Sequence, residues 1–171
     1  MILHFKNIVF MLIFGSLFSC SSSEAQVKNS TYRLLLKTIY KKTVPLLSVQ
    51  ELAKNKDKYI LLDAREIAEY EVSHIENAVF VGYDNFKAKR VSEIDKKQPI
   101  LVYCSVGYRS ERIGEKLQKM GFEEVYNLNG GIFEWLNQDK KVVDKQEQKT
   151  KKIHAFSKTW GIWAEKGEKV Y

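Results

Sequence analysis

Short, almost continuously apolar runs constrain the fold of this chain more than any other feature. Residues 59–62 and 100–103 contain almost no polar side chains, as expected for strands of a parallel sheet that is covered on both faces. Two further strands are predicted over 78–81 and 125–128. Segments with helical features lie between these strands, and this alternation is typical of an α/β domain built on a parallel sheet.

Helix signals occupy the segments between the strands. Ser48 and Glu51 form a capping box that opens a helix reaching about Asn55. An apolar stripe after residue 110 stops at Gly121, where a helix end is expected. Further helices are predicted over 67–72, 85–97 and 132–137, and a last strand of the domain over 142–143.

The distribution of charge argues against a nucleic-acid-binding protein. The chain of 171 residues carries a formal charge of +7, but residues 44–138 hold 13 Lys and Arg against 15 Asp and Glu, a net charge of −2. The basic excess therefore lies in the flanking segments, and no motif for RNA or DNA accompanies it. We expect no nucleic-acid partner.

The N-terminus has the features of a targeting segment. The apolar run over 8–18 is too short to span a bilayer but suits the core of a signal peptide. It ends in Leu17-Phe18-Ser19-Cys20, which resembles the bacterial lipoprotein signal. That resemblance implies a signal peptide over 1–19, a lipid on Cys20, and a periplasmic domain held to a membrane of the cell envelope. An ordinary cleaved signal or an uncleaved anchor is the alternative.

Two segments flank the predicted domain. Residues 20–43 are expected to form a tether and then an amphipathic helix, because apolar residues recur at helical spacing over 32–40. This helix would either pack on the domain or lie near the membrane. Residues 145–171 form a C-terminal extension that contains Trp160 and Trp163, and we expect it to pack on the domain.

Cys104 is the strongest candidate for a reactive residue. The sequence has two cysteines, so lipidation of Cys20 would leave Cys104 as the remaining thiol. Cys104 follows a buried strand directly, and ligands bind at this edge of parallel α/β sheets. Gly107 permits a sharp turn, so that loop N–H groups, the next helix and Arg109 would favour a thiolate or a bound anion. A cysteine simply buried at a strand end is the alternative.

Three ordered motifs resemble those of the rhodanese family. Residues 62–66, with Glu69-Tyr70 and His74-Ile75 after them, are similar to its opening signature. Residues 101–110 are similar to its active-site loop, and residues 129–132 with Trp135 to its closing signature. The resemblance covers 44–144. Ser73 and the pair Glu76-Asn77 depart from the family pattern, which affects a turn remote in sequence from Cys104.

The resemblance implies a fold and a reaction. The fold is a rhodanese-like α/β domain whose central parallel sheet is flanked by helices on both faces. The reaction is transfer of sulfane sulfur from a small anionic donor such as thiosulfate to a thiol, on a small molecule or a protein, or to cyanide. Catalytic Cys104 would carry the sulfur as a persulfide, without a metal or another cofactor. The predicted substrate-binding residues are Ser105, Val106, Gly107, Tyr108 and Arg109.

Asp63 and Arg65 lie at a strand end, where we expect an ion pair that shapes the site rather than one that touches substrate. His74 is interpreted as structural.

A cysteine-dependent phosphatase is disfavoured, because its loop needs Arg after five intervening residues, whereas Arg109 follows Cys104 after four and Ser110 holds the sixth position. The remaining alternative is a non-enzymatic rhodanese-like sulfur carrier, sensor or interaction module of the cell envelope.

Overall fold

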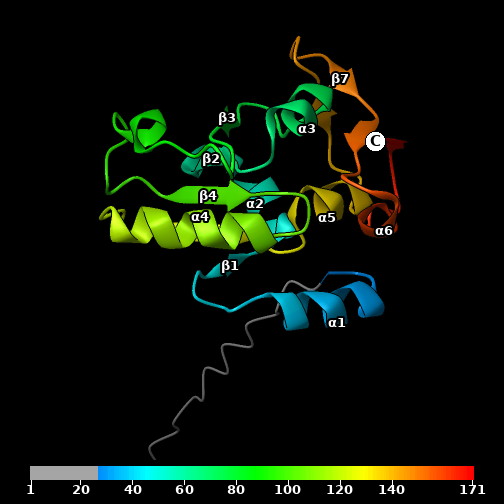
Figure 1. Ribbon diagram of the computed structural model, residues 1–171, viewed down its shortest axis with the longest axis horizontal. Helices are drawn as coiled ribbons and strands as arrows, with labels where there is room; N and C mark the ends of the chain where they lie inside the picture. The colour runs from blue at the N-terminus through cyan, green and yellow to red at the C-terminus, as the bar shows by residue number, and fades with distance from the viewer. Residues whose placement is uncertain (1–26) are drawn as a thin grey trace, which may run out of the picture.

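The computed structural model describes residues 27–171 (Figure 1). The predicted signal peptide over 1–19, the lipid attachment at Cys20 and the first part of the tether lie outside the described residues. Among the helices that the structure describes, none combines the length and apolar character needed to cross a membrane.

A five-stranded parallel sheet forms the centre of the molecule. Its strand order is β1-β5-β4-β2-β3, and every neighbouring pair is parallel. The strands are β1 (Leu46–Leu47), β2 (Ile60–Asp63), β3 (Val79–Phe80), β4 (Ile100–Tyr103) and β5 (Val125–Leu128). Four of these strands were predicted from the apolar runs. The two-residue strand β1 was missed, because so short a segment has no readable periodicity.

Alternate residues of the strands face two separate cores. In β4, Leu101 and Tyr103 face one core while Ile100 and Val102 face the other, as the two-residue period of a strand requires. The first core is covered by α1 (Ser30–Ile39), α2 (Val49–Asn55) and α5 (Gly131–Asn137), and the second by α4 (Tyr108–Lys119). The predicted α/β class, with helices on both faces, is confirmed (Figure 1).

The helix in the N-terminal flank packs on the domain. Tyr32 and Leu36 of α1 are buried in the first core, and the hydroxyl of Tyr32 donates a hydrogen bond to the Gly130 carbonyl at 2.8 Å. The apolar stripe of α1 therefore faces protein.

Two details of the sequence interpretation are corrected, and one further strand is confirmed and placed. The helix expected over 85–97 was wrong: this stretch is mostly turns with a short 3-10 helix, η2 (Ala88–Val91), because Val91 is its single fully buried apolar side chain. Helix α4, predicted from an apolar stripe after residue 110, begins earlier, at Tyr108, four residues after Cys104. The strand predicted over 142–143 is confirmed as β6 (Val142–Val143), which lies outside the central sheet and pairs antiparallel with β7 (Lys149–Thr150).

The C-terminal extension is ordered by a second small sheet and a short helix. Strand β8 (Lys152–His154) pairs in parallel with β9 (Glu168–Val170), and α6 (Lys158–Gly161) lies between them in the chain. Figure 1 shows this orange and red segment beside α5. Its buried residues include Ile153 and Ala164, and the Trp163 ring stacks on the Tyr32 ring with centroids 5.2 Å apart.

Deleting residues 153–171 is expected to destabilise the whole domain. A fully buried large apolar side chain contributes roughly 1.5–3 kcal/mol, so removal of Ile153 and of the Trp163–Tyr32 stack should lower the melting temperature by about 10 °C or more. Differential scanning calorimetry measures the shift. Ile162→Ala is the matched control, because Ile162 lies in the same segment with 60% of its surface exposed. Equal melting of the deletion and the full chain would contradict this prediction.

Candidate active site

Cys104 lies at the carboxyl end of β4, the middle strand of the central sheet. The residue is 1% exposed, and its Sγ accepts a hydrogen bond from the Gly107 N–H at 3.1 Å. Helix α4 begins directly after Gly107, so its N-terminal end, which favours negative charge, faces the same loop. The sulfur therefore sits where a thiolate or a sulfur-bound anion would be stabilised by backbone groups.

Side chains from two distant segments, Asn127 of β5 and Tyr40 after α1, hold the loop in this shape. Gly107 has a φ of +101°, a conformation that favours glycine. Its carbonyl accepts a hydrogen bond from Asn127 Nδ2 at 2.9 Å, and Asn127 Oδ1 accepts one from the Ser110 hydroxyl at 2.7 Å. The hydroxyl of Tyr40 donates to the Val106 carbonyl at 2.6 Å. These bonds fix the backbone that directs the Gly107 N–H at the sulfur.

The start of α5 closes the loop from its other side. The Ile132 N–H donates to the Cys104 carbonyl at 2.9 Å, and the Phe133 N–H donates to the Ser105 carbonyl at 3.2 Å. This close approach depends on Gly131, whose φ is +58° and where an added Cβ would overlap the Cys104 carbonyl oxygen. The glycine pair of the closing signature therefore supports the loop that carries the thiol.

A buried ion pair joins the loop to α3 (Ile67–Val72). Both terminal nitrogens of Arg109 donate to the carboxylate of Glu69 at 2.7 Å, and Ser105 donates its hydroxyl to the same carboxylate at 2.8 Å. Burial alone would raise the pKa of Glu69, but the hydrogen bond from Arg109 and the nearby guanidinium charges outweigh it and lower that pKa. The Arg109 charge is thus already balanced within the protein.

Glu69 is one residue of the site that the sequence interpretation missed. It appeared there as part of a signature, without a role. Its pairing with residues 36 and 40 positions away is a tertiary contact, and the one signal for it was an acidic residue in a segment otherwise expected to form a short helix.

Asp63 and Arg65 form a second, fully buried ion pair. Arg65 Nε lies 3.0 Å from Asp63 Oδ1, and Arg65 Nη2 lies 2.6 Å from Asp63 Oδ2. Arg65 also donates to the Ser73 carbonyl at 2.6 Å. Neither residue lines the pocket at Cys104. Their link to the site is electrostatic, since the charge of Arg65 helps to lower the pKa of Glu69.

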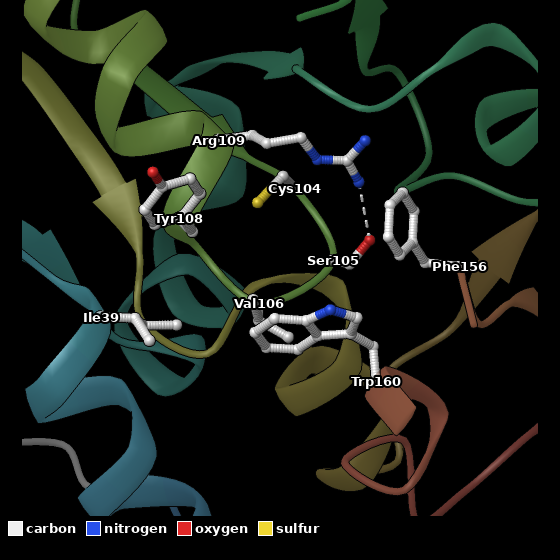
Figure 2. A pocket seen from close by; sticks show the side chains of 8 residues that line it. All are labelled: Ile39, Cys104, Ser105, Val106, Tyr108, Arg109, Phe156 and Trp160. Carbon is white, nitrogen blue, oxygen red and sulfur yellow. Dashed lines mark hydrogen bonds between the residues drawn. The ribbon is translucent and has the colours of Figure 1, made fainter. Parts of the chain in front are cut away.

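A pocket of about 350 Å³ opens above the thiol (Figure 2). Five of the predicted site residues line it, namely Cys104, Ser105, Val106, Tyr108 and Arg109. Gly107 does not line the pocket but donates its N–H to the Cys104 sulfur. The other walls of the pocket come from Ile39 of α1 and from Phe156 and Trp160 of the C-terminal extension. Sequence analysis placed none of these three at the site, because nothing local to them indicates where their segments fold back.

His74 lies outside the lining of this pocket. His74 is buried, with Nδ1 3.0 Å from the Tyr70 carbonyl and Nε2 3.0 Å from Glu147 Oε1, and its ring stacks on that of Tyr70. Within residues 27–171, no three acidic, His or Cys side chains come together in a way that could hold a metal ion.

The Arg109–Glu69 pair should make the folded state sensitive to acid. Because the pKa of Glu69 is lowered from 4.5, its contribution is fully present above that pH and is lost as the pH falls through the lowered folded value. Glu69→Gln should therefore lower the free energy of unfolding at neutral pH by about 1–3 kcal/mol and flatten its dependence on acid.

Denaturant unfolding at a series of pH values between about 3 and 7 measures this effect. Glu76→Gln is the matched control, since Glu76 makes a surface ion pair with Lys56 and its side chain is 58% exposed. This control should change stability little. If Glu69→Gln left the acid slope of the wild type unchanged, the pair would not be the cause of that slope.

The fold and the site together define a class of protein. A thiol at the carboxyl end of a central parallel strand, beside a backbone N–H donor and the start of a helix, is typical of cysteine-dependent α/β domains. Residues 48–138, more than half of the chain, match the Rhodanese-like domain family. The chain belongs to this family.

Individual relatives agree with this membership. Thiosulfate sulfurtransferase GlpE of Coxiella burnetii is 38% identical over 95 residues, which cover 55% of this chain and 86% of that relative. The tRNA uridine(34) hydroxylase of Cytophaga hutchinsonii is 35% identical over 86 residues, 48% of this chain, but the match spans just 28% of that protein. The crystal structure of the BH2092 protein from Bacillus halodurans covers 67% of this chain and 84% of its own, with a TM-score of 0.55 at 22% identity, which shows the shared fold.

Proposed function

We propose that this protein is a sulfurtransferase that carries sulfane sulfur as a persulfide on Cys104. The observation that carries the proposal is the placement of Cys104, whose Sγ accepts a hydrogen bond from the Gly107 N–H at 3.1 Å and which lines the pocket. A thiolate there can attack the outer sulfur of a donor, and the loop N–H groups can stabilise the anionic persulfide that results. The similarity to a relative named as a thiosulfate sulfurtransferase supports this reading.

The proposed reaction has two balanced steps. With thiosulfate as donor, the Cys104 thiolate attacks the outer sulfur, a new S–S bond forms at Sγ, and sulfite leaves with the electron pair of the broken S–S bond. A thiolate or cyanide then attacks the outer sulfur of the persulfide and regenerates the Cys104 thiolate. No oxidant is consumed in either step.

The loop geometry supports sulfur chemistry over phosphate chemistry. Phosphatase loops place Arg at the position held here by Ser110, and the Ser110 hydroxyl is buried in its bond to Asn127. Arg109, one residue earlier, is bound to Glu69. Neither residue is positioned to encircle a tetrahedral oxyanion with free donors.

Mass spectrometry of the intact protein tests the proposal. Incubation with thiosulfate or an organic persulfide should add about 32 Da at Cys104, and cyanide or a thiol should remove it. Repeated turnover separates an enzyme from the alternative of a non-enzymatic sulfur carrier or sensor, which would not convert donor and acceptor in amounts far above its own concentration. Hydrolysis of an aryl phosphate that depends on Cys104, with no persulfide formed, would overturn the assignment.

We also propose that the protein is anchored to the bacterial cell envelope through a lipid on Cys20, with the domain in the periplasm. The short apolar run before Leu17-Phe18-Ser19-Cys20 supports this location. Cys20→Ala should block processing and lipid attachment, so the variant should keep the mass of the unprocessed chain without acyl groups. A mature wild-type protein without acyl chains in its mass would contradict the anchor.

A further inference from the structure

The pocket at Cys104 is built in part by segments outside the family-matched residues. The match covers residues 48–138, yet Ile39 lies before this range and Phe156 and Trp160 lie after it. These three side chains complete the pocket around the loop residues (Figure 2). The features that select a substrate are therefore supplied by this chain's own flanking segments as well as by the shared domain.

The walls of this pocket are apolar and partly open to solvent. Tyr108 and Phe156 are 43% and 53% exposed, and Ile39 and Trp160 are half-buried. These large apolar side chains face water around a reactive atom. An apolar ligand that covers them removes their surface from water, which favours its binding. A volume of about 350 Å³ is enough for a group of the size of one aromatic ring.

The positive charge at the pocket is already paired with a carboxylate. Arg109 is the charged side chain among the lining residues, and Glu69 holds both of its terminal nitrogens at 2.7 Å. A dianion such as thiosulfate would have to share Arg109 with this carboxylate and would be repelled by it at close range. The aromatic walls would also strip water from the dianion, and no unpaired positive side chain among the lining residues would compensate for this loss of hydration.

The aromatic wall is held in place by local structure. Phe156 has a φ of +61°, an unfavourable conformation for a bulky residue that persists where the surroundings enforce it. Its N–H donates to His154 Nδ1 at 3.1 Å, and the Arg109 guanidinium carbon lies 5.2 Å from its ring centroid. Ser157 caps α6 by accepting the Trp160 N–H. The backbone that carries both rings is thus held beside the site.

Resting on the sulfur transfer proposed above, we infer that the substrate of this site is an apolar organic thiol and its persulfide, with a carbon body about the size of one ring. The Cys104 thiolate attacks the outer sulfur of R–S–SH. The Sγ–S bond forms as the S–S bond to R–S breaks, the electron pair leaves with R–S⁻, and the proton stays with the transferred sulfur. The reverse step loads the sulfur onto the same thiol, so one pocket serves both directions.

The rate of Cys104 persulfide formation, followed on the full chain by mass spectrometry at varied donor concentration, tests this inference. The donors are benzyl persulfide, released in situ from a protected precursor, and thiosulfate. The second-order rate constant of the wild type should be at least about 10-fold higher for benzyl persulfide than for thiosulfate. Phe156→Ala should lower the benzyl persulfide constant by about 5- to 10-fold and change the thiosulfate constant by less than about 2-fold.

Trp160→Phe provides a second variant, because it keeps an aromatic side chain in the partly buried position and trims the wall. It should lower the benzyl persulfide constant selectively as well. Ile162→Ala is the matched control on the same extension, outside the pocket lining, and should leave both constants unchanged. Equal constants for the two donors in the wild type, or a parallel loss for both donors in Phe156→Ala, would overturn the substrate class while sulfur transfer stands. Absence of a persulfide with every donor would overturn the proposed function itself.

Discussion

Replacing Cys104 with serine should reduce sulfur transfer to background. A serine hydroxyl is not ionised at neutral pH and cannot form the S–S bond that carries the sulfur. The substitution keeps the size of the side chain, and the new hydroxyl can still accept the Gly107 N–H that now reaches Sγ at 3.1 Å. The loss should therefore exceed about 10³-fold in kcat/KM, with little change in the melting temperature.

Steady-state turnover with thiosulfate or an organic persulfide, and the mass of the protein after donor treatment, measure the two consequences. The sequence holds one other cysteine, Cys20, so Cys20→Ser is the matched control and should retain turnover and the added mass. Turnover in Cys104→Ser within about tenfold of the wild type would mean that another group carries the sulfur, and the proposed mechanism would be wrong.

The sequence predicted the inner part of the sheet well because strands β2, β4 and β5 are largely buried on both faces. Runs such as 59–62 and 100–103 are apolar on both faces of the strand, so they can be recognised from the sequence without tertiary information. The prediction of a helix over the polar stretch 85–97 failed for the opposite reason. Its composition is compatible with a helix, but it buries one apolar side chain fully, Val91, and isolated helices of that length are marginal without an apolar face to pack.

The candidate site was predictable only where it is local in the chain. Residues 104–109 are consecutive, so the loop and its thiol could be recognised together. The partner of Arg109 could not, since Glu69 lies 40 positions away and the sequence offers many carboxylates. As a result, the expected free anion-binding Arg is instead a residue in a neutralised pair. Phe156 and Trp160 escaped prediction because their place depends on how the extension folds back.

Gly131→Ala should destabilise the protein more than an ordinary glycine substitution. The backbone at this position has a φ of +58°, and the added Cβ would overlap the Cys104 carbonyl oxygen and lie 2.6 Å from the Ser105 carbonyl oxygen. Backbone atoms cannot move aside as a flexible side chain can, so either α5 or the active-site loop must shift. We expect a loss of about 3 kcal/mol or more in the free energy of unfolding, as for other severe steric and backbone effects, together with impaired sulfur transfer in the fraction that folds.

Gly121→Ala isolates the steric part of this effect. Gly121 also has a positive φ, +87°, but an added Cβ there would meet no atom within 4 Å. Both variants therefore incur the cost of forcing alanine into the left-handed region, about 1–2 kcal/mol, and Gly131→Ala alone incurs the clash at the thiol-bearing loop. Denaturant unfolding should show a larger loss for Gly131→Ala, and sulfur transfer by folded Gly121→Ala should match the wild type. Equal losses in the two variants would show that the contact between α5 and the loop is not as tight as the structure has it.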